Sequence, residues 1–152
     1  LDENYNGEKP DILDNAFVIV NFENGARGML DLCMFAENSK VQEEICGVGH
    51  KGKIETSVPS NASGKHSSDL SIGLRGSNEI LTKVIEVDKE ILKAGSHHGS
   101  TFYEHLGFIN AIRNNTAPEV SLEDGLKAVA IGQAAEISIK ENRVVYLTEL
   151  LN

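Results

Sequence analysis

The first half of the chain carries short apolar segments of strand length, each bounded by residues typical of turns. Two such segments, residues 16–22 and 28–35, flank Asn24-Gly25, a dipeptide typical of hairpin turns because both residues tolerate positive φ. Turns at residues 49–52 and 76–78 and a polar loop at residues 59–68 join four further expected strands: 41–48, 53–58, 70–75 and 80–87. No long helical pattern separates the strands, so the sequence predicts an antiparallel sheet.

A helical repeat replaces the strand pattern in the last third of the chain. One amphipathic helix is expected to end at Asn114-Asn115, with apolar residues at i, i+4, i+7 and i+10: Phe102, Leu106, Ile109 and Ile112. Ser121, followed three residues later by Asp124, is typical of the capped start of a second helix, which we expect to stop at Asn142.

The second helix presents two different surfaces. Its expected apolar stripe is Leu122, Leu126, Val129, Gln133 and Ile137. A narrow surface of Gly132, Ala134 and Ala135 would let it lie close to the sheet. Residues 144–147 are predicted to form a final strand.

The first two strands are apolar on both faces. In a sheet covered by helices on one side, the second face would be exposed: Phe17, Ile19, Met29, Cys33 and Phe35. An exposed apolar patch of this size indicates a contact with another subunit. The alternative is a closed barrel or two stacked sheets built from this chain alone. The predicted fold class is α+β, with an open, mainly antiparallel sheet, helices on one face and oligomerisation through the other.

The composition of the chain limits its expected domain number, partners and location. The 152 residues are 40% hydrophobic and 24% charged, which suits a single domain spanning residues 1–152. The net charge of −9 argues against nucleic acid or an anionic membrane as the partner. The sequence has no apolar run long enough to span a bilayer and no signal segment at its start, so a cytoplasmic location is expected. Cys33 and Cys46 are expected to be buried, reduced thiols, with a disulfide possible only if their strands pair in register.

His97-His98-Gly99-Ser100, just ahead of a helix, is the best candidate for a binding site. Imidazoles can hydrogen-bond hydroxyl groups or relay protons near neutral pH, and the small residues let a ligand approach the backbone. The alternative is a helix cap with solvated histidines. We expect no metal site, because His97 and His98 with Glu104 and His105 lack a metal-ligand spacing.

Other motifs give no reactive site. Glu43 and Glu44 point to opposite faces of a strand and cannot act as a pair of acids. The sequence shows no phosphate-binding glycine loop between a strand and a helix, so no nucleotide-binding fold is expected in this chain.

Several segments together resemble a known family. The opening hairpin, residues 14–28, and the next, around Glu44-Ile45-Cys46-Gly47 and Gly52-Lys53-Ile54-Glu55, are similar to the C-terminal domain of the glucose–fructose oxidoreductase/inositol dehydrogenase/rhizopine catabolism family. The closing helices resemble it at Phe102-Tyr103-Glu104, Phe108, Ala111-Ile112, Pro118-Glu119-Val120, Glu123-Asp124-Gly125 and Ala134-Ala135. The resemblance covers roughly residues 12–148.

The resemblance implies an NAD(P)-dependent oxidoreductase of sugars, polyols or related compounds. NAD or NADP would bind to an N-terminal Rossmann domain that this chain lacks, and the sheet would form a homodimer or tetramer. The family's catalytic Asp and His have no counterpart here and are expected upstream of Leu1. Glu8-Lys9-Pro10 shares the letters of the family's lysine motif but lies in another context, so we interpret it as a coincidence. His98-Gly99-Ser100 matches a His-Gly-Gly segment that lies at the substrate in some relatives.

The sequence therefore predicts the C-terminal half of a sugar, polyol or inositol-like dehydrogenase that acts by hydride transfer. Its expected substrate-binding residues are His97, His98, Gly99 and Ser100, and the chain alone is expected to be inactive. Two alternatives remain open: an NAD-dependent glycoside hydrolase of the same fold, and a non-catalytic dimerisation or sensing domain.

Overall fold

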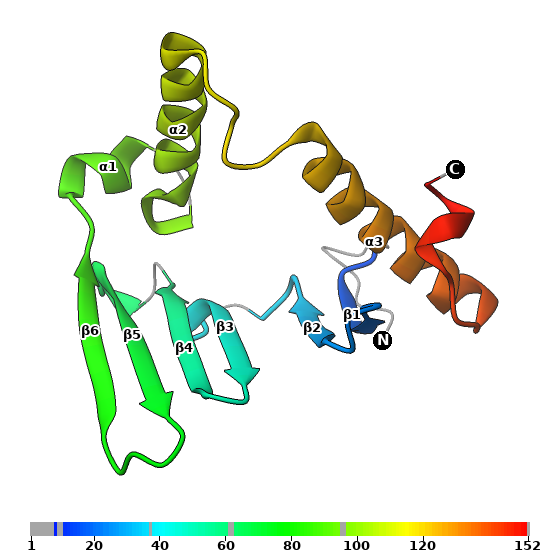
Figure 1. Cartoon of the computed structure of the whole chain (residues 1–152), viewed down its shortest axis with the longest axis horizontal. Coiled ribbons are helices and arrows are strands. Elements are labelled where there is room, and N and C mark those ends of the chain that lie inside the picture. Colours follow the sequence, from blue (N-terminus) through cyan, green and yellow to red (C-terminus); the bar gives the residue numbers. More distant parts are fainter. Residues whose placement is uncertain (1–7, 9–10, 37, 61–62, 95–96, 152) are drawn as a thin grey trace. The chain divides into compact units, whose positions relative to one another are not determined.

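The computed structural model describes residues 8, 11–36, 38–60, 63–94 and 97–151. The chain divides into two compact units, one formed by Leu1–Ala36 with Val120–Asn152 and the other by Glu37–Glu119. All strands precede the main helices, and every described strand pair is antiparallel. The predicted α+β class is therefore confirmed, with the strands in a two-stranded and a four-stranded sheet (Figure 1).

The first unit opens with the hairpin of β1 (Asn15–Asn21) and β2 (Arg27–Cys33). Its turn contains Gly25 at φ 84°, a left-handed conformation that glycine adopts without steric cost. The register pairs Ile19 with Met29, so both lie on one face of the hairpin with Phe17. These side chains are 72%, 76% and 78% exposed respectively. The second face of the hairpin is thus uncovered, as predicted, although Phe35 beyond β2 is half-buried.

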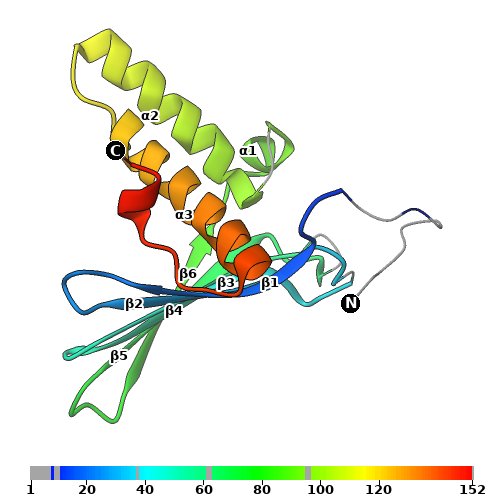
Figure 2. The same cartoon turned by 90° about the vertical axis from the view of Figure 1, so that its right-hand side faces the viewer.

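Helix α3 (Leu122–Glu141) lies beside this hairpin in both views (Figures 1 and 2). Its start is the predicted capping box, in which the Ser121 side chain accepts from the Asp124 amide and the Asp124 carboxylate accepts from the Ser121 amide. Its buried residues are Ala130 and Ala134. The predicted apolar stripe is mostly wrong as a buried surface, because four of its five members are exposed: Leu122, Leu126, Val129 and Gln133. Small side chains allow the closest approach, so the helix buries its alanine face instead.

The predicted strand at residues 144–147 is wrong. The chain turns there into a short 3₁₀ helix, η3 (Leu147–Glu149). Arg143 fixes this turn, because its guanidinium donates to Glu141, to Glu149 and to the Val144 carbonyl. The same contacts raise the pKa of Arg143, chiefly through Glu149, and lower the pKa of Glu149, chiefly through Arg143.

The second unit contains a meander of four strands: β3 (Val41–Gly49), β4 (Gly52–Pro59), β5 (Ser67–Leu74) and β6 (Ile80–Glu86). Each strand pairs with the next along the chain, so the sheet order is β3-β4-β5-β6. The ladders place Gly47, Ile54, Ile72 and Leu81 in one row across the sheet. Side chains in such a row share a face.

One face of this sheet is largely aliphatic and uncovered. Residues two positions apart on a strand share a face, so Ile54 and Leu81 are joined on it by Ile45, Leu74 and Ile85. All five side chains are exposed. The opposite face is richer in polar residues, with Glu55, Ser71 and Thr82 in one row.

Three helical segments follow β6: α1 (Lys89–Ala94), the 3₁₀ turn η2 (His97–Gly99) and α2 (Ser100–Asn114). Helix α2 is the predicted amphipathic helix, and Asn115 closes it at φ 52°. Helix α1 was not predicted, because it is too short to show a helical repeat. It is the element that joins the sheet to η2, beyond one end of the strands (Figure 1).

Both cysteines are free, as predicted, but neither is buried. Cys33 lies on the uncovered face of the hairpin and Cys46 on the polar face of the four-stranded sheet. The expectation of burial was wrong because each sheet leaves a face open. In the part of the chain that the structure describes, no helix has the length and apolar character needed to cross a membrane.

Candidate functional site

The predicted His97–Ser100 segment folds into an unusual backbone between α1 and α2. His97, His98 and Gly99 follow one another at φ 55°, 55° and 88°, all in the left-handed region. Gly99 is the residue that this geometry requires most, because a Cβ there would lie 3.0 Å from both Ile91 Cγ2 and Val87 Cγ1. A conformation that L-residues avoid indicates a segment held by its surroundings.

Two contacts hold the segment on either side. The Nδ1 atom of His97 lies 2.7 Å from Oε1 of Glu43, which belongs to β3. The Ser100 hydroxyl donates to the His97 carbonyl at 2.9 Å. The first contact joins η2 to the edge of the sheet, and the second closes the turn into α2.

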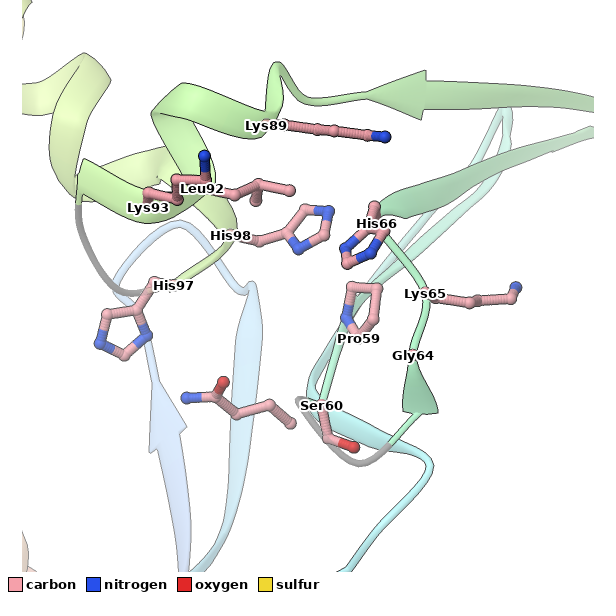
Figure 3. Close-up of a pocket in the computed structure, with 11 residues that line it drawn as sticks. Pro59, Ser60, Gly64, Lys65, His66, Lys89, Leu92, Lys93, His97 and His98 are labelled. Atoms are coloured by element: carbon pink, nitrogen blue, oxygen red, sulfur yellow. The ribbon is translucent and has the colours of Figure 1, made fainter.

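A hollow of about 620 Å³ lies between α1, η2 and the loop after β4. Helix α1 contributes Lys89, Leu92 and Lys93, and η2 contributes His97 and His98. Gln42 and the loop supply the remaining lining residues: Pro59, Ser60, Gly64, Lys65 and His66. Figure 3 shows His98 reaching from its turn toward His66, with Leu92 behind it. A cavity of this size suits a small-molecule ligand.

His98 is the most informative residue of this hollow. Its Nε2 atom is buried and has no hydrogen-bond partner among the described residues. Leaving a buried polar atom without a partner costs free energy, so such atoms are rare and point to a missing group. A ligand hydroxyl or oxyanion in the hollow would supply that partner.

The structure thus brings two of the four predicted residues, His97 and His98, to one cavity. Gly99 is buried and Ser100 supports the turn, but neither lines the hollow. Glu8 is exposed, and Lys9 and Pro10 lie outside the described residues. The described residues contain no cluster of three His, Cys, Asp or Glu that could hold a metal.

The basic residues of the lining were missed by sequence reasoning: Lys65, His66, Lys89 and Lys93. The loop before β5 reads as a polar connection, and the lysines of α1 read as ordinary surface charges. A weak signal was available, since Lys89 and Lys93 are four residues apart just ahead of the His pair.

Residues 1–147 match the sequence model of a family described as "Oxidoreductase family, C-terminal alpha/beta domain". No curated protein matches the chain. The family match covers nearly all of the sequence and includes both compact units. The chain therefore belongs to the Gfo/Idh/MocA oxidoreductase family, of which it represents the C-terminal α/β domain.

Proposed function

We propose that this chain is the substrate and oligomerisation domain, residues 1–152, of an NAD(P)-dependent oxidoreductase. Its substrate would be a sugar, a polyol or an inositol-like compound, oxidised or reduced by hydride transfer. The observation that carries the proposal is the buried, unpartnered Nε2 of His98 in a hollow of suitable size. Membership of the oxidoreductase family supports it.

The described residues do not fit a dinucleotide. Such a cofactor supplies or accepts the hydride, and its pyrophosphate needs a glycine loop that runs from a strand into a helix. Gly47, Gly49 and Gly52 have the spacing of that loop, yet they form the turn of an antiparallel hairpin in which Gly49 pairs with Gly52. No helix follows them, so we assign the cofactor to a separate N-terminal domain and derive no step through it here.

The role of the chain's own residues is to bind and orient the substrate. Nε2 of His98 can hydrogen-bond a substrate hydroxyl, which satisfies the buried nitrogen when the ligand enters. His97 is held in place by Glu43, and this contact fixes the turn that presents both rings. Positioning of this kind lowers the barrier of a reaction by fixing the geometry in advance.

The test uses the intact oxidoreductase that contains this chain. His98→Asn keeps a residue that tolerates positive φ but removes the imidazole. We expect kcat/KM to fall about tenfold to a hundredfold, as for the loss of one buried hydrogen bond. His50→Asn, at the exposed turn between β3 and β4, is the matched control and should leave kcat/KM unchanged. An unaltered kcat/KM in His98→Asn would contradict the proposal.

The assignment of the cofactor to a separate domain can be tested independently. The 152-residue chain alone should neither bind NAD(P) nor turn over any sugar or polyol, because its glycine turn leads into a strand. Calorimetric titration with NAD and NADP measures this directly. Tight binding by the isolated chain would overturn the assignment of the cofactor to another domain.

We further propose that the aliphatic face of the four-stranded sheet pairs with a second copy of this chain. The face carries exposed aliphatic side chains on all four strands, a property that suits a two-fold interface in which each copy presents the same surface. Light scattering over a dilution series should show a persistent dimer or tetramer. A monomer at all concentrations would count against this interface.

A further inference from the structure

The side chains that line the hollow beside His98 differ in charge from the chain as a whole. Among the described residues that line it, none is acidic, whereas three are lysines and three are histidines. The whole sequence, by contrast, has a net charge of −9. A lining with basic side chains and no acidic ones is a local feature of the site, and an unpaired cation within it favours ligands of negative charge.

Some of these basic groups already have acidic partners outside the lining. Lys65 pairs with Asp69 at 3.2 Å, Lys93 with Glu90 at 2.7 Å, and His97 with Glu43. Within the described residues, Lys89 makes no ion pair and His66 no side-chain hydrogen bond, and Nε2 of His98 has no partner. Lys89 and His66 are therefore available to a ligand at this cavity, and the buried Nε2 of His98 lacks a partner that a ligand could supply.

These three groups lie together. Figure 3 shows the Lys89 side chain extending above the rings of His98 and His66, which face each other from η2 and from the loop before β5. An ammonium and two imidazoles around one space can each donate a hydrogen bond to an oxyanion. Hydrogen bonds of this kind are shorter and roughly twice as strong as those between neutral groups.

We propose that this hollow binds an anionic group, a carboxylate or a phosphate ester, carried by a polyhydroxylated substrate. Lys89 provides the charge, while His98 and His66 provide oriented donors. The inference rests on the proposed function in one respect, namely that the hollow is the substrate site. A neutral polyol would leave the Lys89 ammonium without a counter-ion, so it binds this hollow less tightly than its acidic counterpart.

The test measures binding to the 152-residue chain without any turnover. Glucose, gluconate, glucose 6-phosphate and inorganic phosphate are titrated separately, and binding is followed by calorimetry and by the NMR signals of the His98 and His66 rings. We expect at least one of the two acidic sugars to bind about tenfold more tightly than glucose. Whichever of them binds more tightly identifies the source of the anionic group.

Variants assign the preference to Lys89. Lys89→Gln should abolish the tenfold preference, and Lys89→Arg should retain most of it, since Arg keeps the charge. Lys51→Gln is the matched control, because this exposed lysine lies in the turn between β3 and β4, at the other end of the ladder from Pro59. It should leave the preference unchanged.

Three outcomes would overturn the proposal. Glucose could bind as tightly as both acidic sugars. Lys51→Gln could reduce the preference as much as Lys89→Gln, which would indicate a general charge effect. Inorganic phosphate could bind as tightly as glucose 6-phosphate, which would show that the hollow does not hold a substrate's hydroxylated part.

Failure of this proposal and failure of the proposed function are distinguishable. If the acidic sugars bind but the intact protein oxidises none of them, the ligand class stands and the oxidoreductase role of the site falls. If the intact protein turns over a neutral polyol with a kcat/KM that depends on His98, the site is catalytic and the anionic class is wrong.

Discussion

His97 and Glu43 are 54 residues apart in the sequence, yet the imidazole Nδ1 and the carboxylate Oε1 lie 2.7 Å from each other. The contact joins the turn that precedes α2 to the first strand of the meander. Among the described residues, this hydrogen bond connects the predicted His pair to the sheet. The side chains are about half exposed, so its main effect is on position rather than on stability.

Glu43→Gln should therefore loosen the turn without unfolding the chain. We expect the NMR signals of the His97 and His98 rings to shift, while the free energy of unfolding changes by less than about 1 kcal/mol, as for other exposed ion pairs. Glu44→Gln is the control, since Glu44 points to the opposite face of β3. Equal shifts in the two variants would show that the contact has no specific role.

Substitution by Ala should have opposite effects on stability at Gly99 and at Gly107. Gly99→Ala should destabilise the chain by about 1–3 kcal/mol, because the residue has φ 88° and its Cβ would crowd Ile91 and Val87. Gly107→Ala, inside α2 with no atom within 4 Å of the added Cβ, should stabilise it by about 0.5–1 kcal/mol. Urea denaturation measures both changes. A stable Gly99→Ala variant would mean that the turn is not held as described.

The proposed dimer interface gives a further prediction. Leu81→Lys should shift the protein toward monomer, because it places a charge on the aliphatic face of the sheet. Thr82→Lys puts the same charge on the other face and should leave the mass unchanged. Leu81 is 59% exposed, so the lysine has access to water within one copy. A persistent oligomer in Leu81→Lys would place the interface elsewhere.

The capping box of α3 predicts a dependence on pH. The hydrogen bonds from the Ser121 side chain and amide lower the pKa of Asp124. A carboxyl whose native pKa is lowered stabilises the fold above its ordinary pKa of about 4, and this contribution is lost as the pH falls through the lowered value. NMR titration of Asp124 should show the lowered pKa in the native chain.

Ser121→Ala tests the cause of this pKa shift. The pKa of Asp124 should move back toward its ordinary value, and the free energy of unfolding should drop by about 1 kcal/mol, the usual effect of losing a cap. Ser138→Ala, near the end of the same helix, should leave the pKa of Asp124 unchanged. An unshifted Asp124 in Ser121→Ala would contradict the capping geometry.

The sequence predicted the elements that are determined by residues close together in the chain. The strand pattern located all six strands to within a few residues, and Ser121 with Asp124 marked the start of α3. The αL residues Asn115 and Asn142 end the two helices where asparagine predicted it.

The predictions that failed concern features that depend on contacts between residues distant in the sequence. Residues 144–147 have the apolar content of a strand, but the guanidinium of Arg143 and its carboxylate partners turn the chain instead. The sequence indicated only part of the hollow, because Lys65 and Lys89 are separated by two strands along the chain. They line the same cavity only once β5 and β6 are paired. The His pair was found because its residues are adjacent.

The meander order of the four-stranded sheet has a consequence for how the chain acquires its structure. Every ladder joins neighbours in the sequence, so contact order is low and each hairpin closes a short loop at little entropic cost. The Glu43–His97 contact spans the entire meander, and its loop closes cheaply only after the hairpins have formed. In a refolding experiment, backbone protection in the strands should therefore precede the signals of the histidine rings, and ligand-binding capacity should be the last property to return.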